Sequence, residues 1–591
     1  MAEEVKLTNP ELIMLVNDKE DGFNYRKRRE EDWRENYTLG RDKVQTNRLE
    51  QRQSVNVPLM KTTTLTVLKD VDDMPVIYFE NLDNNKDAEI FQNEYWKKTM
   101  EMNKSEVQDI VDKRQVIHFG RAFDQWQIVD GKIKWTVQDT EDILVSRFTD
   151  PWNINSSRFL IHTHIFEPLS RLSLNKDYDQ EAILNLKKFY STQQGLIKAA
   201  DNLNTLQAKN QKMADMGVPD LESPILGETY CELSLHFRWL DNEKDSKGNL
   251  MPPQIFLFVQ ADDQQILMKK PQEEVIGVTK DHWWRDHYAY HSWAIEVDRQ
   301  DVWTDGIADV VRTPNKILNA WFSQLVENRT LRNFGMKFYD ATKEGFSPGS
   351  YQPVPFGWYG VPGKPSDVMQ SVEIPDLSES LDEMTFLIDM VNRATGASLT
   401  QQGELPQRQL ALGIIQLSLG EAKERAKGMS KFNIPVWKER AMTFLKLIEA
   451  GENKLDDVKI YKKGRNTDHI YSQEIGPKDW MTKSGYGVKI WNQDEKLTND
   501  TNRLQKQNAV KQVMPDNPKV DEVYKRNLLD FAEYTPEDIN DVMMYESQKN
   551  KAPMVDAMGN PINPGQPGMV NGGQPNRMAI QPGQMPPQPV A

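Results

Sequence analysis

Hydrophobic and polar positions follow three successive patterns between residues 178 and 335. A long polar helix is expected first, although its apolar periodicity is poor over residues 184–216. Strands are expected next over residues 228–300, where a polar turn at 241–249 separates two alternating apolar runs, as in a hairpin. A second helix follows, so the pattern predicts a compact strand block held between two helices.

The second of these helices has the clearer signal. Thr313 is predicted to cap it and Pro314 to occupy its first position, where the missing N–H has no helical partner to lose. Gly335 can end the helix in a left-handed conformation. Apolar residues at spacings of three and four predict one packing face: Ile317, Leu318, Trp321, Phe322 and Leu325.

The first 177 residues mix helical and strand patterns. Helices are predicted over residues 8–36 and 88–111, and strands over residues 116–143 and 157–166. Asp130 and Gly131 form a strong hairpin signal between two alternating runs. Residues 58–70 stay open, because the threonines at 62–64 favour a strand whereas Leu65 and Leu68 also fit a helix. The fold class indicated is α+β.

Glycine and proline residues separate the elements that are predicted after residue 335. An ordered irregular loop is expected over residues 347–364, where both residue types are dense, and a helix over 377–394. A polar segment at 396–406 precedes the longest predicted helix, 407–450. Pro435 lies within that helix, which must therefore kink or divide there.

The C-terminal part shows three further patterns. Strand-like alternation returns over residues 456–491, and three short helices are predicted over 499–549. Residues 550–591 hold many prolines and glycines with scattered Gln, Asn and Met, and almost no charge. Such a tail cannot bury enough apolar surface to fold and is expected to be disordered by itself.

Composition narrows the class of protein. A chain of 591 residues can form several cores, and its 15 tryptophans argue against disorder, because large aromatic side chains need burial. The net charge of −15 does not suit a sequence-specific DNA-binding domain, which normally presents a basic face. The single cysteine, Cys231, excludes an intramolecular disulfide and suits a reducing compartment. With no signal-peptide pattern and no apolar run of about 20 residues, a soluble intracellular protein is expected.

No motif for catalysis, cofactor binding or metal binding stands out. The chain has no G-x-x-x-x-G-K-[ST] or G-x-G-x-x-G sequence, and the nearest string, at 360–366, has the wrong spacing. Asp70, Asp72 and Asp73 can in principle hold magnesium, but acidic runs in so acidic a chain are more often solvated loops. We therefore predict no catalytic residue, cofactor or metal ligand, and no enzymatic activity.

Histidines and the lone thiol favour structural roles. His282, His287 and His291 match no common zinc spacing, and the aromatic residues around them indicate a packed strand. His162 and His164 lie in an alternating strand, where sheet packing is again the favoured interpretation. Cys231 lies in a similar strand without a basic neighbour, so an inert buried thiol is expected.

Basic and amide side chains are the remaining candidates for a ligand contact. Residues that can reach phosphate lie on the second helix (Arg312, Lys316, Arg329 and Arg332), around the 396–406 segment (Arg393 and Arg408), and at Lys462, Lys463 and Arg465. For each of them taken separately, a solvated surface position or an ion pair between subunits is the favoured alternative.

The order of these patterns resembles the portal (head-to-tail connector) proteins of tailed bacteriophages, over about residues 20–545. The strings that carry the resemblance are, in order, VNVPLMKTTTLTVLKD, KWTVQDTEDILVSRFTDP, SRFLIHTHIF, the strand block, WAIEVDRQDVWTDGIADVVRTPNKILNAWFSQLVENRTLRN and RATGASLTQQGELPQ. None of these is a rigid motif, so the resemblance rests on the ordered set.

The resemblance implies an elongated multi-domain fold with wing, stem, clip and crown, assembled as a ring of about twelve subunits around a central channel. The implied division is an N-terminal wing at 1–177, a stem helix and connection at 178–227, a clip at 228–300, a second stem helix at 301–335, a wing continuation at 336–395, a tunnel loop at 396–406, a kinked wing helix with strands at 407–498, crown helices at 499–549 and a tail at 550–591. The packing face of the second helix then becomes the stem contact.

The resemblance also implies a function. A portal ring occupies one capsid vertex of the virion, after assembly in the host cytoplasm, and double-stranded DNA is packaged and ejected through it without sequence recognition. Implied partners are the terminase large subunit, the head–tail adaptor or tail proteins, and the major capsid and scaffold proteins, with no membrane. Candidate DNA contacts are Arg393, Gln401, Gln402 and Arg408. The alternatives are a virion or scaffold component without a channel, or a soluble enzyme without a recognisable motif.

Overall fold

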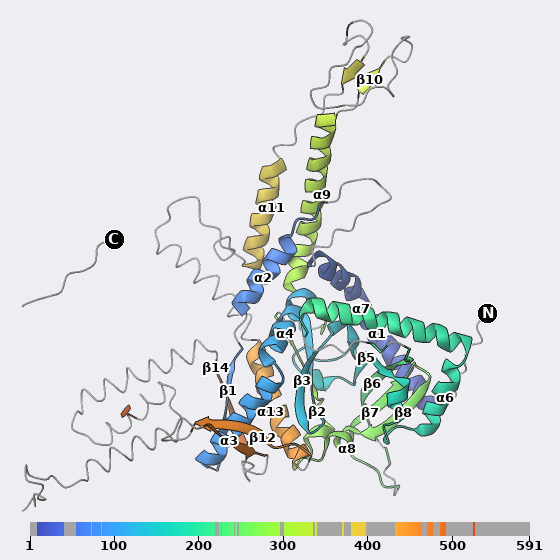
Figure 1. Ribbon diagram of the computed structural model, residues 1–591, viewed down its shortest axis with the longest axis vertical. Helices are drawn as coiled ribbons and strands as arrows, with labels where there is room; N and C mark the ends of the chain where they lie inside the picture. Colours follow the sequence, from blue (N-terminus) through green and yellow to red (C-terminus); the bar gives the residue numbers. More distant parts are fainter. Residues whose placement is uncertain are drawn as a thin grey trace, which may run out of the picture. The chain divides into compact units, whose positions relative to one another are not determined.

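The computed structural model describes most of residues 9–339 and parts of 364–491, together with Tyr524 and Lys525. Residues 1–8, 41–54, 296–300, 340–363, 397–431 and nearly all of 492–591 lie outside this description, as do shorter stretches in between. By its internal contacts the chain divides into two units after Lys496, and the elements from α1 to β14 all belong to the first unit. Helices and antiparallel sheets are both present (Figure 1), so the expected α+β class is confirmed. Apart from Tyr524 and Lys525, the expected crown helices and tail lie outside the described residues.

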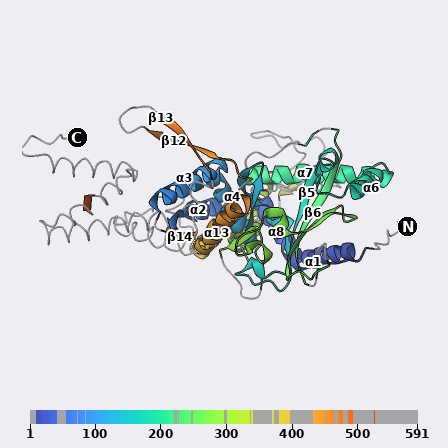
Figure 2. The ribbon, with the colours of Figure 1, turned by 90° about the horizontal axis from the view of Figure 1, so that it is seen from below.

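A five-stranded antiparallel sheet is the largest sheet among the described residues. Its strands follow chain order: β4 (Ile143–Val145), β5 (Phe159–Pro168), β6 (Tyr230–Leu240), β7 (Gln254–Ala261) and β8 (Gln265–Pro271). Phe256 and Phe258 of β7 pack with Leu15 of α1 (Pro10–Gly40), whereas Val259 and Ala261 pack with α6 (Gln180–Tyr190). Helices therefore cover both faces (Figure 2), which is why β7 is buried along its whole length.

This sheet corrects the predicted position of the strand block at 228–300. The predicted hairpin is present, because β6 pairs antiparallel with β7. The block does not stand alone between two helices, however, since β6 also pairs with β5 from Phe159–Arg238 to Pro168–Tyr230. Alternation in a sequence shows that a strand has a buried face but does not identify its neighbour, and two-stranded hairpins are marginal by themselves.

A second core joins segments that are far apart in the sequence. β2 (Arg121–Val129) pairs with β3 (Lys132–Gln138) through the expected turn at Asp130 and Gly131, and with β9 (Tyr290–Ala294) on its other side. α13 (Asn433–Gly451) packs on this sheet through a core rich in aromatic side chains, among them Trp96, Trp126, Trp135, Trp437 and Phe444. β1 (Val76–Asn81) pairs with β14 (Tyr486–Trp491) at the edge of the same core. Residues before 140 and after 430 thus share one core.

Several helices differ in extent from their predictions. The open segment at 58–70 is a helix, α2 (Leu59–Val71). The helix predicted over 88–111 divides into α3 (Lys86–Met102) and α4 (Ser105–Phe119), because Lys104 takes a left-handed conformation with φ 51°. The long polar helix likewise divides into α6 and α7 (Gln193–Met216), and the Thr192 side chain caps α7. Local backbone breaks interrupt the periodic pattern in both places.

Proline positions also differ from expectation. α9 runs from Ile307 to Phe334, so Pro314 lies inside it and Thr313 is not its cap. The helix starts earlier because Ala308 and Val311 are fully buried, and this packing outweighs the hydrogen bond that proline removes. Pro435 lies in the first turn of α13, where no kink is required. The preceding part of the predicted 407–450 helix lies outside the described residues.

The five-stranded sheet and the second core, with the helices that pack on them, are called the body below. A helix–ribbon–helix unit is inserted in the chain between β9 and α13 of this body. α9 leads to a short antiparallel ribbon of β10 (Lys337–Tyr339) and β11 (Met369–Ser371), and α11 (Ser380–Thr395) returns beside α9 (Figure 1). The predicted helix at 377–394 therefore corresponds to α11. The remaining elements are α5 (Leu169–Leu172), α8 (Gln272–Ile276), the short 3-10 helices η1 (Thr140–Asp142), η2 (Ile154–Ser156) and η3 (Trp283–Arg285), and the hairpin of β12 (Val458–Lys463) and β13 (Ile470–Ile475).

Candidate functional site

The predicted packing face of the second helix lies against α2 and α11. Leu318 is almost completely buried, at 1 % exposure, in a cluster with Ala308 and Val311 of α9 and with apolar residues of the two other helices. Trp321, Phe322 and Leu325 lie half-buried at its border. Ile317 does not join them and remains 36 % exposed. Four of the five candidate stem residues are therefore engaged within one chain.

Polar side chains of α9 hold the start of α2. Asn315, Asn319 and Ser323 are spaced by four residues and so share one side of the helix. Their side-chain oxygens accept backbone N–H groups of Met60, Val57 and Val55 at 3.0, 2.7 and 3.0 Å. The Met60 N–H belongs to the first turn of α2, which leaves it without a helical partner, whereas Val55 and Val57 precede the helix. Polar as well as apolar contacts therefore fix the position of α2 and of the segment before it against α9.

The N-terminal part of α9 is tied to α1 by ion pairs. Arg29 contacts Asp309 at 2.5 Å, Arg312 contacts Asp32 at 2.9 Å, and Lys316 contacts Glu35 at 2.5 Å. Arg312 and Lys316, two of the basic residues considered for phosphate binding, are thus partnered by carboxylates of the same chain. Neither is a free cation for DNA in this arrangement.

The structure describes one of the four candidate DNA-contacting residues, Arg393. Arg393 lies on α11, near its C-terminal end, and its position is exposed. Phe386, Met390 and Arg393 are spaced by four and three residues and share the side of α11 opposite to its buried residues Met384 and Val391. Gln401, Gln402 and Arg408 lie outside the described residues, as does the 396–406 segment beyond Gly396.

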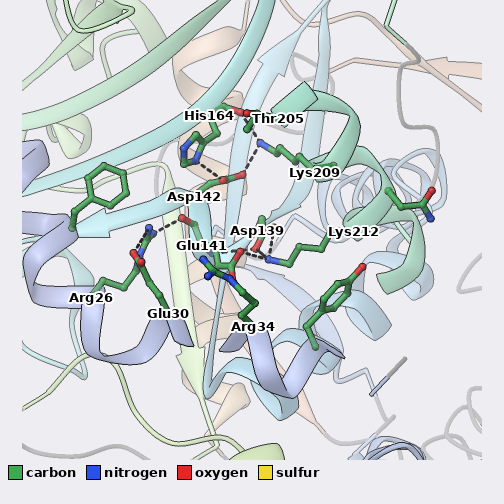
Figure 3. A pocket seen from close by; sticks show the side chains of 14 residues that line it. Arg26, Glu30, Arg34, Asp139, Glu141, Asp142, His164, Thr205, Lys209 and Lys212 are labelled. Atoms are coloured by element: carbon green, nitrogen blue, oxygen red, sulfur yellow. Dashed lines mark hydrogen bonds and ion pairs between the residues drawn. The ribbon is translucent and has the colours of Figure 1, made fainter. Parts of the chain in front are cut away.

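A charged pocket of about 590 Å³ lies between α1 and α7 (Figure 3). Its residues are Phe23, Arg26, Glu30, Arg34 and Tyr37 of α1, Asp139, Glu141 and Asp142 at η1, His164 of β5, and Thr205, Ala208, Lys209, Gln211 and Lys212 of α7. This site was not among those predicted from the sequence, because its members come from four separate segments. Spacing along one segment carries no signal for such a group.

Charged side chains that line this pocket form ion pairs with one another. Lys212 Nζ lies 2.8 Å from oxygens of both Asp139 and Glu141, and Lys209 Nζ lies 2.6 Å from Asp142 Oδ2. His164 Nδ1 lies 2.9 Å from Asp142 Oδ1. Burial alone would raise the pKa of Asp142, but Lys209 and His164 lower it well below its usual value. Asp142 therefore stays ionised, and the charges of the pocket neutralise one another.

The inner side of α7 is polar, which explains its poor apolar periodicity. Lys198, Asn202, Thr205, Lys209 and Lys212 recur at spacings of three and four. Lys198 pairs with Glu232, and Asn202 donates to the carbonyl oxygen of Tyr230, in addition to the lysine contacts above. The helix is thus held to the body largely by charged and polar contacts. A scan for apolar faces cannot recognise such a helix.

The geometry of the pocket does not favour catalysis. Asp142 orients His164 as a base would be oriented in a catalytic triad. The Thr163 hydroxyl donates to the backbone carbonyl of Asp142 and lies 3.2 Å from Nδ1, the nitrogen already facing the carboxylate. The other nitrogen, Nε2, lies 3.8 Å from a carboxylate oxygen of Glu232. We interpret the ion pairs as a clamp between α7 and the body.

We expect Lys212→Met to loosen this clamp. Removal of the ammonium leaves Asp139, whose side chain is 4 % exposed, without the partner that offsets its burial. Amide hydrogen exchange in the C-terminal half of α7 should become about 10-fold faster, while exchange in β2 and β3 stays unchanged. Lys188→Met, at an exposed position of α6, is the control and should leave both regions unchanged. Unaltered exchange in α7 of the Lys212 variant would contradict the clamp.

A buried charge network lies in the aromatic core. The Arg440 guanidinium of α13 contacts Asp112 Oδ2 at 2.8 Å and Asp124 Oδ1 at 2.7 Å, and all three side chains are fully buried. Trp126 and Trp135 donate their indole N–H groups to Asp124 Oδ2 at 2.8 and 2.9 Å. The network joins α4, β2 and α13 at the centre of the core.

The two aspartates of this network differ in pKa. Burial raises the pKa of Asp124, but Arg440 and His291 outweigh it and bring the value to about 2. Burial dominates at Asp112, whose pKa rises to about 6 in spite of Arg440. Asp112 Oδ1 has no hydrogen-bond partner among the described residues, whereas both oxygens of Asp124 accept donors. Different numbers of donors therefore explain the different shifts.

The histidines and the cysteine have structural contacts. His282 lies 2.6 Å from Glu273, His287 stacks on Trp283, and His291 lies 2.8 Å from the Thr443 hydroxyl. Burial raises the pKa of Cys231 well above its usual value, which makes its thiol unreactive. Within the part of the chain that the structure describes, no group of three or more His, Cys, Asp or Glu side chains is arranged to hold a metal ion.

Comparison of the sequence with models of known protein families finds no match, and comparison with curated proteins finds none either. Of the helices in the described ranges, none combines the length and apolar character needed to cross a bilayer. Function is therefore inferred from the arrangement of the chain's own elements.

Proposed function

We propose that this chain is the subunit of a portal ring, a non-enzymatic virion protein through which double-stranded DNA is packaged and ejected. The observation that supports this most is the helix–ribbon–helix unit of α9, β10, β11 and α11, mounted on an α+β body. Two packed helices joined by a small ribbon suit a stem that carries a clip. The body, with its two cores, suits a wing.

The clip of the proposed portal subunit lies later in the chain than the sequence pattern predicted. Strands at 228–300 are part of the five-stranded sheet of the body, so we now include them in the wing. α9 and α11 become the two stem helices, and the segment between them, 335–379, becomes the clip. The order stem, clip, stem, tunnel loop and long helix is unchanged, but the first stem helix is α9 instead of the polar helices α6 and α7.

Charge supports passage of DNA without tight binding. The chain carries a net charge of −15, and Arg312 and Lys316 of α9 are occupied by acids of α1. Cations that are already paired with acids neutralise few phosphates and release few counterions, so binding to a phosphate backbone is expected to be weak. Arg393, near the C-terminal end of the proposed stem helix α11, remains a proposed DNA contact together with Gln401, Gln402 and Arg408 in the segment after it.

Partners and location follow from the resemblance to portal proteins. We propose the terminase large subunit and later the head–tail adaptor or tail proteins as partners of the clip, and the major capsid and scaffold proteins as partners of the wing. The ring would contain about twelve copies and would lie at a capsid vertex of the virion.

Electron microscopy of the purified full-length chain tests the proposal directly. We expect rings of about twelve subunits with an axial hole, and mass photometry should give one dominant mass that corresponds to the same copy number. A monomer at all concentrations, or a closed shell without a channel, would contradict the portal assignment. The second outcome would favour a virion or scaffold component without a channel.

A further inference from the structure

The loop between β4 and β5, residues 146–158, exposes two aromatic side chains. Phe148 is 92 % exposed, the highest value for any large apolar side chain in the described ranges. Trp152 is 60 % exposed, and it is the one exposed tryptophan among those whose burial the structure describes. Single exposed aliphatic side chains are ordinary on a protein surface, but phenylalanine and tryptophan carry large apolar areas that folding normally buries. Two of them in one loop indicate a surface that contacts a partner.

Hydrogen bonds hold the backbone of this loop in place. The buried hydroxyl of Ser146 lies 3.0 Å from that of Thr149 and 3.1 Å from that of Ser157, and the Thr149 hydroxyl lies 2.8 Å from that of Ser157. On the other side of the loop, the buried Arg121 guanidinium donates to the carbonyl oxygen of Pro151 at 3.0 Å. A loop that is fixed before binding loses little conformational entropy on binding, so its exposed rings are preorganised for contact.

The charged side chains of the loop leave two cations without partners. Arg147 and Arg158 are exposed, and neither side chain has an ion pair or a hydrogen bond among the residues that the structure describes. The single acid of the loop, Asp150, accepts the backbone N–H of Trp152 at 3.0 Å, which holds its carboxylate within the turn. The loop therefore offers two free guanidinium groups beside its two exposed rings.

We infer that this loop binds a segment of a partner protein in which carboxylates lie beside apolar side chains. Phe148 and Trp152 pack among the apolar side chains of that segment. Arg147 and Arg158 bind its carboxylates, because the planar guanidinium suits bidentate pairing with a carboxylate. Two rings and two arginines make a small contact area, so the complex is expected to be transient. The inference rests on the exposure, order and charge of the loop and not on the proposed portal function.

Charge favours an acidic protein segment over a nucleic acid at this loop. Binding to a phosphate backbone depends on the neutralisation of many phosphates by many cations, whereas the loop has two arginines and one aspartate. The chain as a whole carries a net charge of −15, which repels a polyanion more strongly than it repels a short segment with a few acids. Such a segment needs only the carboxylates that two guanidinium groups can bind.

A selection from random short peptides displayed on yeast tests this inference with the full-length chain. Peptides are selected for binding to the wild-type chain and are counter-selected on a double variant, Phe148→Ser with Trp152→Ser. We expect the enriched peptides to combine Asp or Glu with Leu, Phe or Trp. One enriched peptide, synthesised with a fluorescent label, is then titrated with the wild-type chain and with single variants, and anisotropy gives the affinity.

Single variants show which side chains of the loop bind the labelled peptide. Phe148→Ala and Arg147→Glu should each weaken its binding about 10-fold or more. Leu174→Ala is the control for the loss of an exposed apolar side chain, because Leu174 is 79 % exposed on the loop after α5. Lys134→Glu, at an exposed position of β3, is the control for the change of charge. Both controls should bind as the wild type does, and circular dichroism and urea unfolding should show that all four variants keep their fold.

Three results would overturn the inference. The first is enrichment of peptides without acidic residues, or of no peptide over the double variant. The second is binding of a thymidine oligonucleotide or a DNA duplex that Phe148→Ala abolishes, since the occupant would then be a nucleic acid. The third is dissociation of wild-type assemblies by Phe148→Ala in mass photometry, since the occupant would then be a second copy of the chain. Rings that form in every variant leave the portal proposal standing, whichever peptides are enriched.

Discussion

Replacement of Arg440 by methionine is expected to lower the free energy of unfolding by about 3–5 kcal/mol. The guanidinium lies between Asp112 and Asp124, which are both fully buried. Without it, the two carboxylates face each other in an apolar core with only indole and imidazole donors left to stabilise them. Urea unfolding followed by tryptophan fluorescence measures the loss, because Trp126, Trp135 and Trp437 surround the site.

The loss should depend on pH in a defined direction. In the native chain, the pKa of Asp124 is about 2, below its ordinary value of 3.8, so this carboxylate stabilises the fold above pH 3.8 and ceases to do so as the pH falls toward 2. Without Arg440 the pKa values of both aspartates rise. The deficit of the variant should therefore be largest near pH 7 and should shrink toward pH 4, where the carboxylates can take up protons.

Lys446→Met is the matched control on the same helix. Lys446 also forms ion pairs, at 2.8 Å from Asp281 and at 3.0 Å from Glu449 of the same helix, but the Asp281 carboxylate is half exposed. Solvent screens such a pair, so the substitution should cost less than about 1 kcal/mol. Equal losses at residues 440 and 446 would contradict the view that the buried network, as opposed to ion pairing in general, stabilises the core.

Leu318→Ala is expected to cost about 3 kcal/mol of stability in the helix pair, whereas Ile317→Ala should cost about 0.5 kcal/mol or less in the isolated subunit. The two residues are neighbours in sequence, yet Leu318 is 1 % and Ile317 36 % exposed. Loss of the Leu318 side chain leaves a cavity among α9, α2 and α11. Amide hydrogen exchange in α11, together with urea unfolding, measures the difference.

This pair of substitutions separates folding from assembly. Leu318→Ala should increase exchange throughout α11 in a monomer as well as in an assembly, because it acts within the chain. Ile317→Ala should leave the monomer nearly unchanged and weaken association instead. If both substitutions destabilise the monomer equally, the packing face of α9 has been misassigned.

Local patterns in the sequence determined much of the secondary structure. The turn at Asp130 and Gly131 is found between β2 and β3, and the alternating run before residue 168 is β5. The helical periodicity at 377–394 corresponds to α11, and the packing face around Leu318 is buried. These features depend on neighbours within a few residues, which is the range over which strand and helix periodicity carries information.

Tertiary structure decided which of these elements belong together. β6 and β7 form the expected hairpin, but only the fold shows that β6 continues a sheet with β5 and so leaves the ribbon at β10 as the module between two helices. Packing at Ala308 and Val311 begins α9 before Pro314, against the local preference. A strand can complete its backbone hydrogen bonds and bury its apolar face against any suitable neighbouring strand. The alternation of its own residues does not specify which strand becomes that neighbour.

Charged contacts between residues far apart in the chain are the features that the sequence pattern predicts least well. Arg440 is separated from its two aspartates by 328 and 316 residues in the sequence, and the lysines of α7 meet acids of η1 about 70 residues earlier. In the sequence, such residues are indistinguishable from solvated charges. A buried charge is stable only when an opposite charge and hydrogen-bond donors surround it, and the completed fold alone brings those partners within 3 Å.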